Sequence, residues 1–359
     1  MKMIKLISPM LLLTLVMFLV NGFAGGLPKH AITRIDTGKG PVNAIAYAQS
    51  INQLAIAAAN NIHIHDADTY KERMVLAGHT DSVQAVTFSA NGKLIVSGSA
   101  DKTVRLWEAE TGKLRRARDE HTAPVNIVAF SLEGEKFWSA SRENNMLRSW
   151  YSRDGGRWST KTSSADIVKS ITTVAFSQYG ETFAQAVEMT MAVKDLSTVK
   201  NRFEDRFEFA VFLSETDTGK ELAPIFTKHR EKIVALTISP SSEFIATGSF
   251  DWTIEVWKIT DTGPLRMDMD LGDPLWILKG HAGTVTSVAF SPNEKILASG
   301  GADQRVRLWD ITTGKHLHTF SNHTSKISAL AFAQDDVLAS GSSDGTVFIW
   351  NLDEIAATN

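Results

Sequence analysis

The feature that most constrains the fold of this chain is a repeated string. Residues 100–107 read ADKTVRLW and residues 302–309 read ADQRVRLW, and the similarity extends without a gap over 86–113 and 288–315. The residue that follows the first apolar run recurs along the chain at Ala48, Ser89, Ser131, Ser177, Ser239, Ser291 and Ala333. The successive spacings are 41, 42, 46, 62, 52 and 42 residues. A basic period near 42 indicates a repeat architecture of seven units, three of them lengthened.

Each unit has the pattern of several short β-strands. In the second unit, the apolar or β-branched runs at 86–88, 94–96 and 104–107 are separated by short segments rich in Gly, Asn and Asp, which is typical of strands joined by tight turns. A further short run, such as 74–76, precedes the next unit. Four antiparallel strands in each of seven units predict an all-β fold, a seven-bladed β-propeller, whose strand edges are short and protected.

The residues that recur with the unit resemble those of the WD-repeat β-propeller family. A Gly-His pair, a Ser-Gly-x-Ala-Asp string and a closing Trp occur in register at Gly78-His79, 97–101 and Trp107, and again at Gly280-His281, 299–303 and Trp309. The resemblance covers about residues 31–352. It implies a propeller that binds protein or peptide partners without catalysis, on the face formed by the turns before each Asp and by the loops around each His.

The resemblance also implies a structural tetrad in each complete unit. In this family a His, a Ser or Thr, an Asp and a Trp form a hydrogen-bonded chain that ties the loop between two units to the inner strands. A buried polar group without such partners costs about 1–3 kcal/mol, and more when it is charged. The expected tetrads are His79, Ser97, Asp101 and Trp107; His229, Thr247, Asp251 and Trp257; His281, Ser299, Asp303 and Trp309; and His323, Ser340, Asp344 and Trp350.

Three units depart from the pattern. The third has Glu143 or Asn144 where Asp is expected, and otherwise keeps His121, Ser139 and Trp150. The first has no His at the start and places His65 at the Trp position. The fourth has no complete tetrad, and its third strand has two possible positions: residues 190–194, with Lys194 at the Trp position, or residues 207–213, with Ser214 there. The sequence leaves both alignments open.

The ends of the repeat region predict how the ring closes. The last unit ends shortly after Trp350 without a fourth strand, whereas residues 31–36 form a spare strand before the first unit. We therefore expect residues 31–36 to complete the last blade. The predicted organisation is a signal peptide at 1–24, a linker at 25–30, one propeller domain at 31–352 and a C-terminal tail at 353–359.

The first 24 residues have the three regions of a secretory signal peptide. Lys2 and Lys5 precede an apolar stretch at 6–20, and small residues lead to Ala24. An apolar run of 15 residues is shorter than the roughly 20 that span a bilayer, so cleavage after Ala24 is preferred over an uncleaved anchor. The sequence thus predicts an exported protein, periplasmic or secreted. It contains no cysteine, so its stability outside the cytoplasm has to come from packing.

Neither the charge nor the short motifs favour catalysis or a cofactor. A formal net charge of −3 does not suggest nucleic-acid binding, which needs a basic excess. The G-x-S-x-G string at 341–345 lies between two expected strands as a copy of the repeat turn, not on a hydrolase elbow. His63 and His65 fit the repeat register better than a metal site, and Asp268, Asp270 and Asp273 lack EF-hand spacing. We predict no catalytic residue, metal or cofactor.

The fifth unit carries the candidate binding site. The residues that flank the Asp of the repeat turn are small or polar in the second, sixth and seventh units, but are Phe250 and Trp252 in the fifth. The loop before this unit adds three cations on the same expected face, and the third unit adds one more; these are Lys228, Arg230, Lys232 and Arg142. Aromatic side chains beside cations suit an extended acidic or aromatic-containing peptide. The alternative is that both aromatics fold onto the neighbouring blade.

These observations predict a monomeric, exported, non-catalytic interaction scaffold. Two other functions stay open from the sequence. One is a propeller enzyme of the cell envelope with its site at the mouth of the central channel, and the other is an envelope assembly or sensing factor. A cluster of acids or metal ligands outside the repeat pattern would favour the enzyme, and the sequence shows none.

Overall fold

The structure is a computed structural model of the chain. It describes residues 27–38, 40–131, 134–141, 146–153, 157–162, 168–177, 182–189, 209–215, 225–259, 273–334 and 336–356. Residues 1–26, which include the predicted signal peptide, lie outside this part of the chain. None of the described helices is long and apolar enough to cross a membrane.

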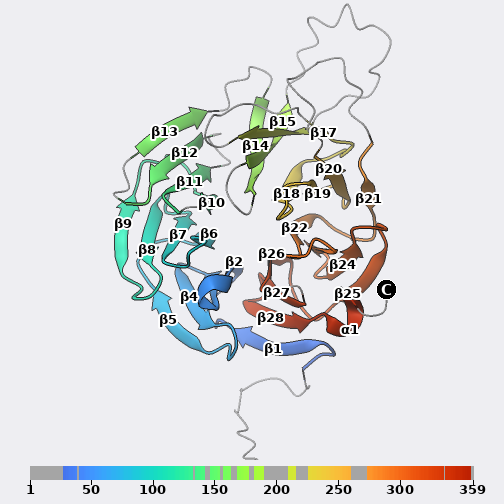
Figure 1. The fold of residues 1–359 in the computed structure, drawn as a ribbon, viewed down its shortest axis with the longest axis horizontal. Helices are drawn as coiled ribbons and strands as arrows, with labels where there is room; N and C mark the ends of the chain where they lie inside the picture. The colour runs from blue at the N-terminus through green and yellow to red at the C-terminus, as the bar shows by residue number, and fades with distance from the viewer. Residues whose placement is uncertain are drawn as a thin grey trace, which may run out of the picture.

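Seven four-stranded antiparallel sheets are arranged in a ring around a common axis (Figure 1). In blades 1 to 6 the strands run in chain order from the innermost to the outermost, and in blade 7 the outermost strand is β1. Blades 1 to 4 are β2 (Val42–Ala48), β3 (Gln53–Ala58), β4 (Asn61–Asp66), β5 (Glu72–Leu76); β6 (Val83–Phe88), β7 (Leu94–Ser99), β8 (Val104–Glu108), β9 (Leu114–Arg118); β10 (Ile127–Phe130), β11 (Lys136–Ser141), β12 (Met146–Tyr151), β13 (Arg157–Thr162); and β14 (Val168–Phe176), β15 (Thr182–Met189), β16 (Phe209–Glu215), β17 (Ile225–Phe226). Blades 5 to 7 are β18 (Ile233–Ile238), β19 (Phe244–Ser249), β20 (Ile254–Lys258), β21 (Trp276–Leu278); β22 (Val285–Phe290), β23 (Ile296–Gly301), β24 (Val306–Asp310), β25 (His316–Phe320); and β26 (Ile327–Phe332), β27 (Val337–Ser342), β28 (Thr346–Asn351), β1 (Ala31–Asp36).

The predicted seven-bladed fold is confirmed, and so is the predicted closure. β1 is the outer strand of blade 7 and pairs antiparallel with β28, from Ala31 opposite Trp350 to Asp36 opposite Thr346. Just after β1, Thr37 N donates to Gly345 O at 3.0 Å. The two ends of the chain therefore build one blade together and close the ring.

The structure also decides between the two alignments of the fourth unit. β16 covers residues 209–215 and pairs with β15, with Ser214 opposite Phe183. In blade 2 the corresponding pair is Trp107 opposite Ile95, so Ser214 occupies the Trp position. Residues 190–208, which include Lys194, lie outside the described residues.

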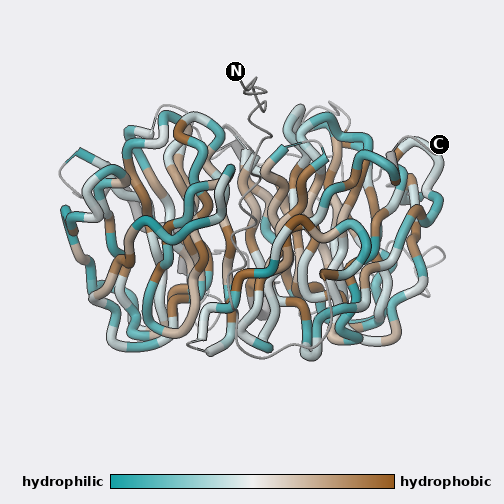
Figure 2. Tube along the Cα trace, turned by 90° about the horizontal axis from the view of Figure 1, so that it is seen from below, coloured by the Kyte–Doolittle hydropathy of each residue, from teal (hydrophilic) through white to brown (hydrophobic). Residues whose placement is uncertain are grey.

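The hydrophobic core lies between the blades. The described residues form seven buried clusters, and each one joins two neighbouring blades. For example, Ile62 and Ile64 of blade 1 pack with Val83, Phe88 and Trp107 of blade 2. Figure 2 shows the hydrophobic residues along the strands and hydrophilic residues in many of the loops at the two faces. Each blade is therefore stabilised by its two neighbours, as in other repeat proteins.

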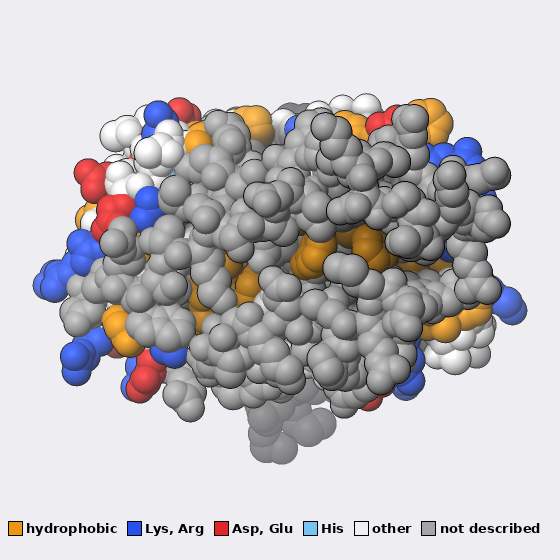
Figure 3. All heavy atoms as spheres, turned by 90° about the horizontal axis from the view of Figure 1, so that it is seen from above, with side chains coloured by type: hydrophobic (Ala, Val, Ile, Leu, Met, Phe, Trp, Pro, Cys, Tyr) orange, Lys and Arg blue, Asp and Glu red, His pale blue; other side chains and the backbone are white. Residues whose placement is uncertain are grey.

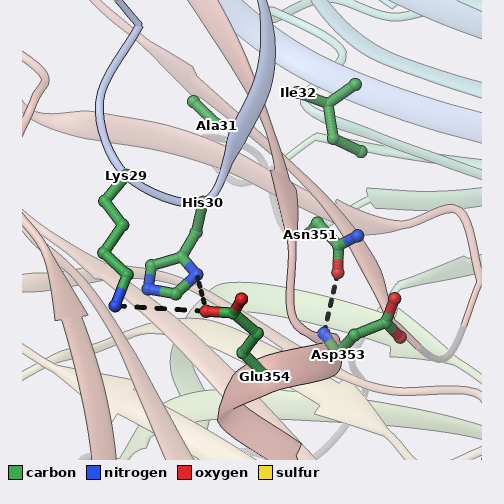
Figure 4. Close-up of a pocket in the computed structure, with 7 residues that line it drawn as sticks. All are labelled: Lys29, His30, Ala31, Ile32, Asn351, Asp353 and Glu354. Carbon is green, nitrogen blue, oxygen red and sulfur yellow. Dashed lines mark hydrogen bonds and ion pairs between the residues drawn. The ribbon is translucent and has the colours of Figure 1, made fainter.

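A short helix covers the seam where the ring closes. The residues predicted as a C-terminal tail include α1 (Asp353–Ala356), whose Ile355 is buried in the core between blades 6 and 7. Glu354 lies 4.0 Å from Lys29 Nζ and 3.8 Å from His30 Nδ1 (Figure 4). A pocket of about 400 Å³ opens at this seam, lined by Lys29, His30, Ala31, Ile32, Asn351, Asp353 and Glu354. Lys29 and His30, which precede β1, pair here with Glu354 of α1, so the pocket belongs to the closure.

Candidate functional site

A chain of hydrogen bonds connects β7 and β8, the second and third strands of blade 2, to the loop before the blade. Trp107 Nε1 donates to Ser97 Oγ at 2.9 Å, Ser97 Oγ lies 2.8 Å from His79 Nε2, and His79 Nδ1 lies 2.8 Å from Asp101 Oδ2. A continuous direction of donation requires a neutral histidine with its proton on Nδ1. Burial lowers the pKa of His79, which agrees with the neutral form.

The same contacts recur in the other tetrads, with one exception. The His Nε2 to hydroxyl distances are 2.8 Å in blade 5, 2.8 Å in blade 6 and 2.9 Å in blade 7. In the two last blades Trp309 and Trp350 donate to the serine hydroxyl at 2.8 Å. In blade 5, Trp257 Nε1 does not bond to the Thr247 hydroxyl, and its side chain interacts with that of Glu255 instead. Blade 5 is the tetrad with Thr247 in place of serine, and threonine is stiffer about χ1, so the predicted tetrad holds only from His229 to Asp251.

The aspartate of each tetrad fixes the loop before its blade. Asp101 Oδ2 accepts the backbone N–H of Thr80 at 3.0 Å, and Asp101 Oδ1 accepts the hydroxyl of Thr103 at 2.7 Å. Burial alone would raise the pKa of Asp101, but hydrogen bonds from Thr103, His79 and Thr80 lower it to about 2. The carboxylate is therefore ionised at neutral pH and holds the turn and the loop together.

Threonine two residues after the aspartate is a member of this network that the sequence analysis missed. Thr103, Thr253 and Thr346 each donate to the Asp at 2.6–2.7 Å. In blade 6, Arg305 occupies this position and Arg307 NH1 donates to Asp303 instead, at 2.7 Å. The recurrence of Asp-x-Thr in three units was the sequence signal for it.

The glycine before the histidine is explained by its backbone conformation. Gly78 has φ +152°, and a Cβ on it would lie 2.5 Å from Arg105 NH1. Gly280 has φ +151°, and a Cβ on it would make only ordinary contacts, the nearest at 3.4 Å to Trp309 Cη2. Only glycine adopts this conformation readily, so the backbone at this point requires the glycine in both blades.

Blade 3 uses a partial version of the network. In blade 3, His121 Nε2 and Trp150 Nε1 each lie 2.8 Å from Ser139 Oγ, and His121 Nδ1 has no partner among the described residues. Burial, and then the positive charge of Arg148, lower the pKa of His121 to about 4. Residues 142–145, which include Arg142, Glu143 and Asn144, lie outside the described part of the chain.

Blade 1 holds its two histidines by side-chain and backbone contacts. His65 lies opposite Leu54, at the Trp position, and its Nδ1 is 3.0 Å from Tyr70 O. His63 Nδ1 is 2.6 Å from Glu72 Oε2. Both histidines therefore contact residues of their own blade, which fits a structural role for them.

Blade 5 differs from the other blades beside its histidine. Where blades 2, 3 and 6 have Arg105, Arg148 and Arg307, blade 5 has Glu255, which is 1% exposed. Glu255 Oε2 accepts the backbone N–H of Lys228 at 3.1 Å, and Oε1 lies 3.9 Å from His229 Nδ1. Burial raises the pKa of Glu255. The loop at 228–230 is thus held by two carboxylates, since Arg230 N donates to Asp251 Oδ2 at 3.0 Å.

The turn of blade 5 presents two large aromatic side chains to solvent. Phe250 is 48% exposed and Trp252 is 53% exposed. Phe250 N donates to Lys232 O at 3.0 Å, which places this turn beside the loop before the blade. Trp252 has φ +71° and its N–H donates to Ser249 O at 3.2 Å. The aromatic turn is therefore held by its backbone, while its side chains stay largely uncovered.

The predicted cations of blade 5 lie on the same loop. Lys228, Arg230 and Lys232 are all exposed, and the loop that carries them is bonded to the aromatic turn. Lys228 Nζ pairs with Asp273 Oδ1. We call Phe250, Trp252, Lys228, Arg230 and Lys232 the blade 5 surface.

Comparison with known proteins identifies the repeat. The family model described as "WD domain, G-beta repeat" matches four segments, at residues 70–108, 220–258, 272–310 and 314–351. The chain is a WD40-repeat β-propeller. WD40 propellers are typically protein-interaction scaffolds without catalytic activity.

Several relatives are similar to this WD40 propeller over part of their length. Protein tipD of Dictyostelium discoideum is 27% identical over 145 residues, which are 40% of this chain and 22% of that protein. Striatin of Mus musculus is 29% identical over 190 residues, 48% of this chain and 24% of striatin. The coronin-like protein of Saccharomyces cerevisiae is 27% identical over 209 residues, 50% of this chain and 32% of that protein. In these three relatives the matches cover no more than about a third of the protein.

The G-x-S-x-G motif lies in a repeat turn of the WD40 propeller. The segment 341–345 spans the turn between β27 and β28, where Ser343 N donates to Lys326 O at 3.0 Å. Asp268 and Asp270 lie outside the described residues. Among the residues that the structure does describe, no group of three or more His, Asp or Glu side chains could hold a metal ion.

Proposed function

We propose that this WD40 propeller is a non-catalytic scaffold that acts outside the cytoplasm and binds protein partners at the blade 5 surface. The observation that carries the proposal is the exposure of Phe250 and Trp252, at 48% and 53%, on a turn whose backbone is fixed. In blades 2 and 6 the same two positions hold Ala100 with Lys102 and Ala302 with Gln304. The aromatic pair is therefore special to blade 5 and is not required by the turn.

The exposure of these aromatics supports binding over a covering role. If Phe250 and Trp252 only covered the neighbouring blade, most of their surface would be buried against it, and about half is not. Large aromatic side chains on a rigid support lose little conformational entropy when a partner covers them, and they are frequent hot spots. The blade 5 surface thus offers two preorganised anchors.

The cations beside the anchors indicate the charge of the partner. Lys228, Arg230 and Lys232 project from the loop bonded to the aromatic turn, in a chain whose formal net charge is −3. Opposite charges raise the rate of encounter and the specificity more than the affinity. We infer that the partner presents an acidic segment that contains aromatic or other apolar residues.

The test removes the anchors and keeps the turn. Quantitative affinity capture with residues 25–359 should recover a partner that the variant Phe250→Ala/Trp252→Ala recovers at least tenfold less. The matched control is Lys102→Ala/Gln304→Ala, because Lys102 and Gln304 occupy the position of Trp252 with φ +68° and +66°. The captured partner is then purified, and its affinity for the three proteins is measured by calorimetry. Equal affinity for all three would place the binding site elsewhere on the ring.

Export is the second part of this proposal and rests on the sequence of residues 1–24. We expect the native protein to begin at Gly25, because Ala24 ends a segment with basic, apolar and small-residue regions. N-terminal sequencing of protein isolated from its native host tests this. A product that begins at Met1 and stays with the membrane fraction would show an uncleaved anchor.

A further inference from the structure

We propose that β9, the outer strand of blade 2, is a docking edge for an extended polypeptide segment with acidic residues at alternate positions. This edge lies on a different blade from the blade 5 surface and would be a second interaction site. The occupant would add a strand to the blade and pair its carboxylates with the arginines of β9.

The first observation is the charge of β9. β9 (Leu114–Arg118) contains three arginines and Lys113 immediately precedes it, so four of the six side chains of residues 113–118 are cationic in a chain of formal net charge −3. The other outer strands, β1, β5, β13, β17, β21 and β25, carry at most two Lys or Arg residues each. Three of the four cations are arginines, whose planar fork matches a carboxylate in two parallel hydrogen bonds.

The second observation is the exposure of this strand. β9 ends the sheet order β6-β7-β8-β9, and its residues from Leu114 to Ala117 are all exposed. Arg115 Nε forms an ion pair with Glu108 Oε1 of β8, at 3.2 Å. β9 lies at the rim of the ring in Figure 1, and Figure 3 shows Lys and Arg side chains, with some Asp and Glu among them, on that flank of the molecule. An edge strand leaves one row of backbone N–H and C=O groups without a strand partner.

The third observation is the register of β9 against β8. A bulge sets Arg115 apart, and beyond it the pairing is regular, with Arg116, Ala117 and Arg118 opposite Leu106, Arg105 and Val104. Alternate residues of a strand share a face and lie about 6.5–7 Å apart. A strand added at this edge has the same spacing, so acidic residues at positions i and i+2 would face Arg116 and Arg118. Ala117 between them is small and leaves the edge accessible.

Charged side chains on an edge strand also protect a protein against aggregation. Cations on an edge repel a second copy of the same strand and so prevent aggregation. That repulsion does not act on an acidic strand, which gains the cross-strand charge pairs and the backbone hydrogen bonds. The same four cations can therefore reject self-association and select an acidic partner. A flexible polyanion would be attracted too, but it would not require acids at alternate positions.

The test compares two labelled peptides of equal composition by fluorescence anisotropy on the full propeller. Peptide TEVEVET places its acids at alternate positions, on one face of a strand, whereas in peptide TEEVVET no two acids are two residues apart. We expect the alternating peptide to bind at least tenfold more tightly. Equal binding would overturn strand addition in favour of a general polyanion, and no binding of either peptide at millimolar concentration would overturn the docking edge.

Variants of the propeller locate the binding edge. Arg116→Glu/Arg118→Glu should weaken binding of the alternating peptide at least tenfold. The control Arg305→Glu/Lys315→Glu makes the same charge change at exposed positions of blade 6 and should change binding less than twofold. Thermal melts establish that both variants are folded, and Arg116→Gln/Arg118→Gln replaces the first if it is not. Unchanged binding by the β9 variant would overturn the proposal. Phe250→Ala/Trp252→Ala should bind this peptide normally, so the two proposed sites fail or succeed separately.

Discussion

Replacing Asp303 by alanine should destabilise the propeller far more than the same change at Asp310, seven residues on. The Asp303 side chain is 6% exposed and accepts hydrogen bonds from Ala282 N at 3.0 Å and Arg307 NH1 at 2.7 Å, with His281 Nδ1 at 3.0 Å. Asp310 accepts from Thr313 N–H and its hydroxyl at 2.6 and 2.8 Å, in a surface turn.

The magnitudes follow from what each substitution leaves behind. Asp303→Ala leaves the guanidinium of Arg307, a residue 9% exposed, without its carboxylate. Breaking a buried ion pair by removing one partner costs about 3–5 kcal/mol. Asp310→Ala loses hydrogen bonds of a solvent-accessible turn, which contribute about 1 kcal/mol. The free energy of unfolding should therefore fall by roughly 2–4 kcal/mol more for Asp303→Ala.

Urea unfolding followed by circular dichroism measures both losses. A third protein, Asp303→Ala/Arg307→Met, lacks both partners of the ion pair. Its stability separates the cost of an unpaired Arg307 guanidinium from the cost of the lost hydrogen bonds. If the unpaired guanidinium dominates, the double variant should be more stable than Asp303→Ala alone. Equal losses for Asp303→Ala and Asp310→Ala would refute the structural role of the tetrad carboxylate. A double variant less stable than Asp303→Ala would refute the account of its cost.

Two further predictions concern closure and pH. A chain that starts at Gly38 lacks β1 and exposes the edge of β28, so its melting temperature should fall by several degrees relative to a chain that starts at Leu27; an equal melting temperature would show that β1 is not needed for closure. The pKa of His121 is lowered from 6.5 to about 4 in the folded protein, so the unfolded chain takes up this proton first as pH falls. Between pH 6.5 and 4 the free energy of unfolding should therefore decrease, by up to about 3 kcal/mol from this residue. Urea melts at pH 7 and pH 4.5 check this, and His121→Gln should show a smaller decrease, whereas an equal decrease would assign the effect to other groups.

The fold could be predicted from the sequence because its information is local and repeated. Each unit carries its own turns and period-two runs, so seven copies predict seven blades without any long-range contact. The fourth unit is the exception, because its sequence allowed two positions for the third strand, at residues 190–194 or 207–213. The structure selects β16, where Phe209, Val211 and Leu213 are buried against blade 5. The choice between the two strand positions depends on packing against the neighbouring blade, and the sequence of one unit gives no information about that packing.

The polar network was predictable only where it repeats. The spacing of 18 residues between His79 and Ser97 returns from His281 to Ser299, and the hydrogen bonds follow it. The network differs in blade 5 because single residues there change which atoms can form hydrogen bonds. Thr247 differs from serine by one methyl group, and Trp257 Nε1 does not bond to its hydroxyl. Glu255 occupies the position at which blades 2, 3 and 6 have an arginine, and its carboxylate accepts a hydrogen bond from the backbone N–H of Lys228. Both changes fall in blade 5, which also carries the exposed aromatics.

The repeat turn shows how a propeller can vary its surface without losing its fold. The first residue of the turn donates its N–H to the loop before the blade at 2.8–3.0 Å in four blades, at Ala100, Phe250, Ala302 and Ser343. The bond uses the backbone, and the following Asp supplies the carboxylate, so neither depends on the side chain at this position. A phenylalanine there therefore costs the network nothing. Substitutions at Phe250 and Trp252 should change binding far more than stability, and a large loss of stability would mean that these side chains pack in the fold after all.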